Sequence, residues 1–292
     1  MNIEKVLILG LNGGFGKLFS NLLAEEGLSI FGIDLAPQPD KLAKCARYLC
    51  GDLSQPDENM LAIARQVDCL LICLPESVAF VALEHFIPAM SADALIVDTL
   101  SVKTTLAQKV TNIREDLQLL SINPMFAPDL GFRDNNVVTV QLSSGLRSDN
   151  FISLMQKWGA HVTSMTASEH DRQTAITQVA THAAIISFGI CLTELGYDPN
   201  KALPISTPVH RTLLALFARI TNQAPEIYWR IQVDNPYAAQ AREAMSASLK
   251  QLADMAYANH QQEFYNALTR SKETLSPCLE ELIAYASRIF QI

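Results

Sequence analysis

The feature that most constrains this chain is a glycine cluster close to its start, Gly10-Leu11-Asn12-Gly13-Gly14-Phe15-Gly16. It lies between an apolar run, residues 6–9, and an amphipathic stretch that begins at Lys17. A strand, a glycine-rich turn and a helix in this order can bind a dinucleotide, because the glycines let the pyrophosphate approach the backbone and the helix N-terminus attracts phosphate. The spacing is G-x-x-G-x-x-G, with Leu11 where the usual first glycine stands. A tight structural turn without a ligand is the alternative.

Two further segments complete the predicted cofactor site. Asp34 ends the second apolar run. A carboxylate at that place can hold the adenine ribose hydroxyls and repels a 2′-phosphate, which favours NAD over NADP. A solvated Asp that caps a loop is the alternative. Leu74-Pro75 follows a later apolar run, where a loop would pass the nicotinamide half of the cofactor.

Apolar runs alternate with helical patterns through the first half of the chain, which is typical of βαβ units and a mostly parallel sheet. After Ala167, long helical stretches dominate, including residues 174–195 and 238–270. We expect an α/β protein with a Rossmann-type dinucleotide-binding domain over residues 1–167 and an all-α substrate and dimerisation domain over 168–292. The apolar surplus of the helices predicts a homodimer. Strands are expected at residues 6–9, 28–33, 69–74, 94–97, 118–122, 137–140 and 161–165.

The composition excludes several classes of protein. The 292 residues are 49% hydrophobic and 18% charged, which is enough apolar material for a sizeable core. The net charge of −8, with 30 acidic and 22 basic residues, argues against a nucleic-acid partner. We expect no membrane span, because no apolar stretch reaches the ~18–20 residues needed, and no signal peptide, so a cytoplasmic location follows.

The six cysteines contain no Cys-x-x-Cys pair, and no metal site is expected. Cys69 and Cys73 lie in one apolar run, on one face of the expected strand. We interpret them as small buried core residues rather than as metal ligands or a redox pair.

Polar segments follow two neighbouring expected strands. Asp98-Thr99-Leu100-Ser101-Val102-Lys103 follows residues 94–97, and Asn123-Pro124-Met125-Phe126-Ala127-Pro128-Asp129 follows residues 118–122. Open α/β sheets bind ligands at the carboxyl ends of their strands, so both segments are candidates for a substrate site. In the helical half, His182 and Arg219 lie on otherwise apolar helices. Taken alone, a histidine such as His182 is more often a core residue, and Arg219 could as easily be a charge on the helix surface.

Together these segments resemble the prephenate dehydrogenase family. Its members carry an Asp-x-x-Ser-Val-Lys segment, a His-Pro-Met-Phe-Gly-Pro-Asp-like segment, a helix with a substrate-binding His and a later helix with a carboxylate-binding Arg. The stretch from Ser206 to Tyr228 also looks like the enterobacterial-type members, and the resemblance covers nearly the whole chain. It implies NAD-dependent oxidative decarboxylation of a cyclohexadienyl acid, without an added mutase-like or regulatory domain.

The resemblance also implies roles for single residues. Ser101 would contact the ring substituent of the substrate, His182 would help to bind the substrate, and Arg219 would pair with a substrate carboxylate, which its planar fork suits. The remaining histidines match no catalytic position and are interpreted as structural or solvated: His85, His161, His170, His210 and His260.

One position departs from the family pattern, because Asn123 stands where the family carries its catalytic histidine. That histidine accepts the proton of the ring alcohol, and an asparagine side chain cannot act as a base. We favour a substrate with an amino group in place of the hydroxyl, 4-amino-4-deoxyprephenate, which would give 4-aminophenylpyruvate. The alternatives are prephenate or arogenate with water or another group as the base, and an inactive NAD-binding sensor. A purely structural role, in which the Asn-Pro pair begins a loop, would also explain an asparagine at position 123.

Overall fold

The computed structural model describes residues 3–38, 45–110 and 114–290. The chain divides into two compact units, Met1–Asp171 and Arg172–Ile292. The first contains every strand of the described residues, and the second is helical. The predicted fold class, an α/β domain followed by an all-α domain, is confirmed, whereas the boundary at residue 167 stays a prediction.

The first unit is built on one eight-stranded sheet with the order β3-β2-β1-β4-β5-β6-β7-β8. Among the strands of the described residues, β6 and β7 alone pair in an antiparallel manner. The chain runs outward from β1 to β3 and then returns to β4 on the other side of β1, and such a switch point is where open sheets bind ligands. The strands are β1 (Lys5–Leu9), β2 (Ser29–Asp34), β3 (Cys45–Cys50), β4 (Cys69–Ile72), β5 (Leu95–Asp98), β6 (Gln118–Pro124), β7 (Asn136–Ser143) and β8 (His161–Ser164).

Helices cover both faces of this sheet, and the side chains of β1 alternate between the two cores. Leu7 and Leu9 belong to the core that also contains Phe86, whereas Val6 and Ile8 belong to the other. Because both faces are buried, the strand is continuously apolar. The first core is covered by α2 (Glu58–Ala64), α3 (Glu76–Ala89) and α4 (Thr104–Val110), and the second by α1 (Gly14–Glu25) and α5 (Leu146–Lys157).

Cys69 and Cys73, from the apolar run 69–74, both pack in the second core, as predicted. Cys69 is fully buried on β4, and Cys73 is partly buried just beyond the end of this strand. Burial raises the pKa of both thiols, that of Cys73 to about 12. Both therefore stay protonated and unreactive near neutral pH.

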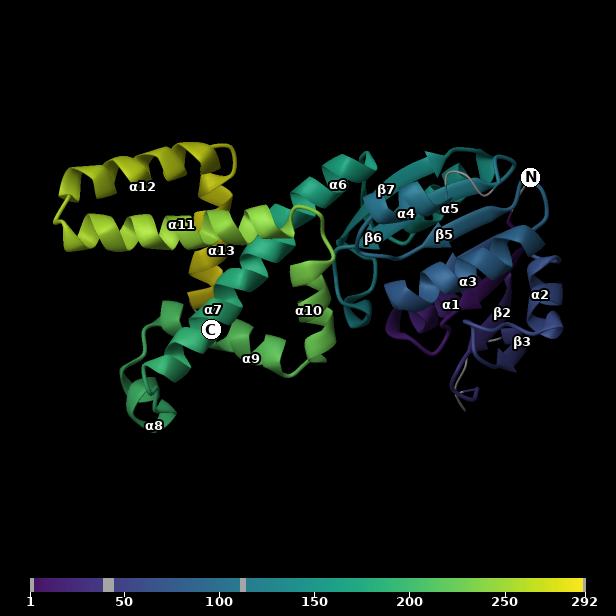
Figure 1. The fold of residues 1–292 in the computed structure, drawn as a ribbon, viewed down its shortest axis with the longest axis horizontal. Coiled ribbons are helices and arrows are strands. Elements are labelled where there is room, and N and C mark those ends of the chain that lie inside the picture. The colour runs from purple at the N-terminus through teal and green to yellow at the C-terminus, as the bar shows by residue number, and fades with distance from the viewer. Residues whose placement is uncertain (1–2, 39–44, 111–113, 291–292) are drawn as a thin grey trace. The chain divides into compact units, whose positions relative to one another are not determined.

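One strand was missed by the sequence analysis, and one expectation about a helix was wrong. The edge strand β3 carries polar and apolar residues without a continuous apolar run, and the sequence pattern did not indicate it. The stretch 238–270 forms two helices, α11 (Ala238–Tyr257) and α12 (Gln261–Leu275), which run alongside each other (Figure 1). The break lies at Asn259, whose φ of 56° is in the left-handed region that asparagine tolerates.

The second unit has a small core of its own. Ala175, Val179 and Ala238 are buried, and Tyr237 packs against them. Its helices are the end of α6 (Ala167–Thr174), η2 (Ala175–Ala180), α7 (Thr181–Glu194), α8 (Pro199–Ala202), η3 (Leu203–Ile205), α9 (Pro208–Thr221), α10 (Pro225–Val233), α11, α12 and α13 (Leu279–Phe290).

One continuous helix, Ala167–Glu194, is 28 residues long, and its most apolar window has a mean hydropathy of 1.6. By length and composition alone, this helix is long and apolar enough to cross a membrane. We had expected no stretch of that length and apolar character. Thr, Gln and His interrupt its apolar residues, which hid the stretch in the sequence. Only 22% of the window is buried within the chain. Such a helix is weak support for a membrane span, since helices that pack in soluble proteins have the same composition.

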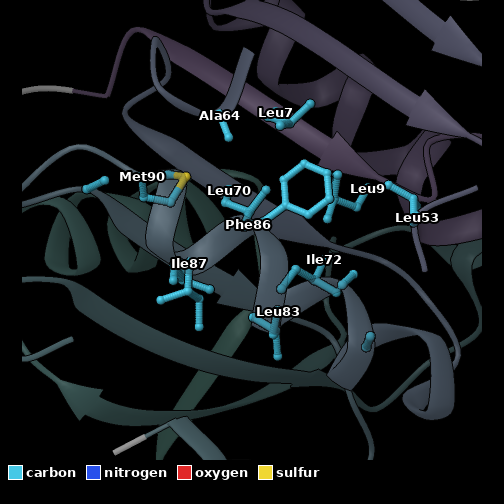
Figure 2. Packing of buried hydrophobic residues seen from close by; sticks show 14 of the residues in the cluster. Leu7, Leu9, Leu53, Ala64, Leu70, Ile72, Leu83, Phe86, Ile87 and Met90 are labelled. Carbon is cyan, nitrogen blue, oxygen red and sulfur yellow. The ribbon is translucent and has the colours of Figure 1, made fainter. Parts of the chain in front are cut away.

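Phe86 on α3 has no exposed surface, and Figure 2 shows its ring among Leu70, Leu7 and Leu9 of the sheet. We predict that Phe86→Ala lowers the free energy of unfolding by about 3–5 kcal/mol, because the cavity cannot collapse against the sheet. Urea denaturation followed by circular dichroism measures this loss. Leu35→Ala, at a side chain that is 73% exposed, is the control and should change stability by less than about 0.5 kcal/mol. Equal losses in the two variants would contradict the packing described.

Candidate functional site

The turn between β1 and α1 requires glycine at two positions. Gly10 has a φ of 81°, and a Cβ atom on it would lie 2.4 Å from the carbonyl oxygen of Cys73. A Cβ atom on Gly16 would lie 2.2 Å from the carbonyl oxygen of Gly10. The loop therefore packs directly against the segment that follows β4. The side chain of Leu74, at the end of that segment, also lies close to Gly10. Pro75 is the N-cap residue of α3.

The structure accounts for Leu11 at the place of the usual first glycine. Leu11 is fully buried, and a Cβ atom on Gly32 of β2 would lie 2.3 Å from its Cδ1. Gly32 thus provides the space that the leucine side chain fills. Gly13, the exposed N-cap of α1, offers no side chain to the first N–H groups of the helix. These groups have no partner within an α-helix, and they attract anions such as a pyrophosphate.

Asp34 is fixed next to this loop at the end of β2. Its Oδ2 accepts a hydrogen bond from Asn12 N (2.9 Å), and its Oδ1 accepts one from Ala36 N (3.0 Å). The side chain of Asn12 donates to Tyr48 Oη (2.9 Å), and burial, with a smaller effect of Asp34, raises the pKa of Tyr48 to about 12. Asn12 Oδ1 is buried without a hydrogen-bond partner in the described parts of the chain. The carboxylate and this oxygen are both acceptors, which fits the hydroxyl groups of an adenine ribose.

The segment 123–129 packs on the glycine loop. The rings of Phe126 and Phe15 meet edge to face with centroids 6.0 Å apart. A Cβ atom on Gly14 would lie 2.8 Å from Cγ of Pro128, at the start of the short helix η1 (Pro128–Leu130). The structure therefore brings the predicted cofactor loop and one predicted substrate segment to the same edge of the sheet.

The buried ammonium group of Lys103 makes polar contacts with residues at the ends of both β5 and β6. Lys103 has no exposed surface, and its Nζ donates to the carbonyl oxygen of Ile122 (2.7 Å) and to that of Leu100. It also pairs with Asp98 Oδ1 at 3.4 Å, and Ser121 Oγ donates to the same oxygen at 2.9 Å. Burial lowers the pKa of Lys103, and the Asp98 carboxylate opposes this shift. Because Ile122 directly precedes Asn123, this ammonium group fixes the backbone that carries Asn123.

We predict that Lys103→Met lowers the free energy of unfolding by about 3–5 kcal/mol, since the buried Asp98 carboxylate loses its counter-charge and the carbonyl of Ile122 loses its donor. Thermal and urea denaturation measure the loss. Lys17→Met, at an exposed lysine of the same unit, is the matched control and should stay within about 0.5 kcal/mol of wild type. A loss below about 1 kcal/mol for Lys103→Met would show that the ammonium group is not required.

Asn123 is buried, and its side chain contacts a histidine that the sequence analysis did not place in the site. Asn123 Nδ2 lies 2.9 Å from His170 Nε2, and His170 Nδ1 lies 2.8 Å from Asp171 Oδ1. His170 and Asp171 have no exposed surface. The expectation that His170 is structural or solvated missed this contact. The adjacent His-Asp pair was the only available signal, and nothing in its spacing linked it to Asn123, which is 47 residues away.

The other predicted substrate residues are divided between the two units. Ser101 is exposed in the bend after β5, whereas His182 on α7 and Arg219 in the last turn of α9 belong to the second unit. The ring of His182 is half-buried and packs edge-on to Tyr228, with centroids 5.2 Å apart. Burial lowers the pKa of His182, against a smaller opposing effect of the Gln178 backbone. Arg219 is exposed. The roles of these three residues stay predictions.

A doubly wound sheet with this loop at its switch point defines a dinucleotide-binding protein. Residues 21–136 match the family model "Prephenate dehydrogenase, nucleotide-binding domain", and residues 166–270 match "Prephenate dehydrogenase, dimerization domain". A 4-amino-4-deoxyprephenate dehydrogenase from Streptomyces pristinaespiralis is 33% identical over 286 residues, which cover 98% of this chain and 96% of that relative. Arogenate dehydrogenase 1 from Arabidopsis thaliana is 24% identical over a region that covers 91% of this chain and 41% of that relative.

The chain therefore belongs to the prephenate dehydrogenase family. Membership confirms the predicted class, a NAD-dependent oxidoreductase related to prephenate and arogenate dehydrogenases. Solved structures agree in fold. Prephenate dehydrogenase from Aquifex aeolicus, in complex with hydroxyphenyl propionate and NAD+, has a TM-score of 0.75 at 17% identity over 95% of this chain and 99% of its own. Arogenate dehydrogenase from Synechocystis has a TM-score of 0.67 at 16% identity over the same shares.

Proposed function

We propose that this protein oxidises and decarboxylates 4-amino-4-deoxyprephenate to 4-aminophenylpyruvate with NAD. The observation that carries the proposal is Asn123, a buried carboxamide at the end of β6 where the family has a basic imidazole. The name of the relative from Streptomyces pristinaespiralis agrees with it.

The chemistry of an amino substrate explains why the family's base is dispensable. NAD, when bound, accepts a hydride from the ring carbon that bears the amino group. The lone pair of the neutral amine forms the C=N bond as the C–H bond breaks. The carboxylate then leaves as carbon dioxide, and its electron pair makes the ring aromatic and returns the nitrogen to a neutral amine. No proton leaves the nitrogen in either step, so a carboxamide that orients the amine is sufficient.

The remaining residues receive roles that fit their surroundings. The lowered pKa of His182 keeps its imidazole neutral near pH 7, so it can hydrogen-bond the substrate without a charge. Arg219 presents a planar fork that can bind a carboxylate with two parallel hydrogen bonds. Ser101 is exposed and available to contact the ring substituent. Asp34, held by two backbone N–H groups, repels a 2′-phosphate and favours NAD over NADP.

We predict that the wild-type protein reduces NAD with 4-amino-4-deoxyprephenate at a kcat/KM at least about 10²-fold above that for prephenate, because general-base catalysis contributes about 10²–10⁴-fold and the hydroxyl substrate lacks a base here. Asn123→His should gain activity with prephenate. The measurement is the absorbance of the reduced cofactor under matched conditions with both substrates.

Other outcomes of this assay would decide for the alternatives. Efficient turnover of prephenate or arogenate by wild type would show that water or another group acts as the base, and would contradict the argument from Asn123. NAD binding without turnover of any of the three substrates would indicate a sensor protein. Leu35→Ala, distant in sequence from Asn123 and exposed, serves as the activity control.

We also propose a cytoplasmic homodimer formed through the second unit. Large apolar side chains are exposed along its helices, among them Ile176 (63%), Ile190 (58%) and Leu249 (66%). Large apolar side chains exposed together on a protein surface are typical of an interface. The match of residues 166–270 to a dimerization domain supports a second copy of this chain, rather than a membrane, as what covers the long helix.

We predict that the purified protein has twice the chain mass of 32.2 kDa in size-exclusion chromatography with light scattering. Ile190→Asp should shift the population to single chains, because a carboxylate cannot be buried in an apolar interface without a partner. Leu35→Asp, at an exposed leucine of the first unit, is the matched control and should stay dimeric. A single-chain mass for wild type, or an unchanged mass for Ile190→Asp, would contradict the dimer.

A further inference from the structure

The two ends of the Asn123 side chain are chemically opposite, since the oxygen accepts hydrogen bonds and the nitrogen donates them. Which end faces the substrate is decided by what holds the other end. Asn123 Nδ2 lies 2.9 Å from His170 Nε2, whereas Asn123 Oδ1 accepts no hydrogen bond from the residues that the structure describes. The question is therefore which nitrogen of His170 carries the proton.

Asp171 decides this question. Its Oδ1 accepts from His170 Nδ1 (2.8 Å) and from Lys103 N (2.9 Å), and its Oδ2 accepts from Thr104 N (2.9 Å) and Thr104 Oγ1 (2.5 Å). Burial raises the pKa of this carboxyl, but the hydrogen bonds from His170, Thr104 and Lys103 outweigh it and hold the pKa below the ordinary value. The backbone donors are Lys103, which precedes α4, and Thr104, the first residue of that helix. The carboxylate stays ionised and requires a proton on His170 Nδ1.

With its proton on Nδ1, His170 can accept a hydrogen bond at Nε2, and the Nδ2–H group of Asn123, 2.9 Å away, is the donor that lies there. We propose that His170, oriented by Asp171, is a positioning residue that fixes the Asn123 carboxamide with its oxygen toward the substrate amine. This inference rests on the proposed function for its effect on rate, but the orientation itself does not depend on the substrate.

The orientation matters because the reaction consumes the lone pair of the amine. As the C–H bond breaks and the hydride leaves for NAD, that lone pair becomes the C=N bond, and both N–H bonds remain. Asn123 Oδ1 accepts one of those N–H groups and leaves the lone pair unoccupied. A reversed carboxamide would donate its own N–H to the lone pair and hold it back. A reversed amide still binds the amine, so its penalty falls on kcat rather than on KM.

The first test is the tautomer of His170 in the full-length protein at neutral pH. Nuclear magnetic resonance of protein with ¹⁵N-labelled histidine separates the Nδ1–H, Nε2–H and doubly protonated forms, and His170→Gln assigns the signal. We expect the Nδ1–H form. The Nε2–H form or the doubly protonated form would place an N–H against Asn123 and overturn the proposal.

The second test is kinetic and uses 4-amino-4-deoxyprephenate with NAD. Loss of the acceptor in His170→Leu should lower kcat about tenfold with little change in KM, the size expected for one hydrogen bond. His170→Gln places an amide oxygen near the position of Nε2 and should recover most of that loss. His161→Leu, at an exposed histidine of the same unit, is the control and should match wild type.

A double-mutant cycle separates positioning from general damage. In an Asn123→Ala background, His170→Leu should change kcat less than twofold, because the group through which His170 acts is gone. An equal fall in both backgrounds, or no fall in wild type, would overturn the proposal. If the Nδ1–H form is found but the amino substrate is not oxidised, the proposed function fails while the orientation of Asn123 stands. If the amino substrate is oxidised but the Nε2–H form is found, only this inference fails.

Discussion

The buried carboxylate of Asp171 is the constraint on which the arrangement around Asn123 depends. It accepts hydrogen bonds from the first turn of α4 and from His170, so it joins the segment after β5 to the helix that begins near the end of the first unit. Lys103 supplies the second tie, because its ammonium group binds the backbone just before Asn123. Leaving either charge unpaired in this interior would cost several kcal/mol. The backbone that carries Asn123 is therefore held in place by contacts within the first unit.

Close packing fixes the glycine loop after β1, the predicted cofactor site at the same edge of the sheet. Gly10 and Gly16 bring the loop after β1 against the segment after β4, and Leu11 fills the space that Gly32 provides. The chain thus departs from the common glycine pattern without losing the tight turn. Phe126 and Pro128, from the segment that begins at Asn123, lie against the same loop. The predicted cofactor and substrate residues of the first unit consequently pack on one core.

Much of the fold and the family resemblance could be predicted from the sequence, because both depend on short local patterns of residues. Seven strands followed from short runs that are mostly apolar, and the family resemblance followed from short segments such as the one that begins at Asn123. The strand β3 was missed because an edge strand needs no continuous apolar run. The break at Asn259 was missed because no glycine or proline marks it. The contact between Asn123 and His170 was missed because only the folded chain brings two such distant residues together.

The central claim is that oxidation of the substrate needs no base, because the amine supplies the electrons and loses no proton as the hydride leaves. Isotope effects on kcat/KM with 4-amino-4-deoxyprephenate test this most directly. Deuterium at the ring carbon that bears the amino group should slow the reaction, whereas deuterated solvent should leave the rate unchanged after correction for viscosity. A substantial solvent isotope effect, present together with the substrate effect, would show a proton in transfer in the same step and would contradict the claim.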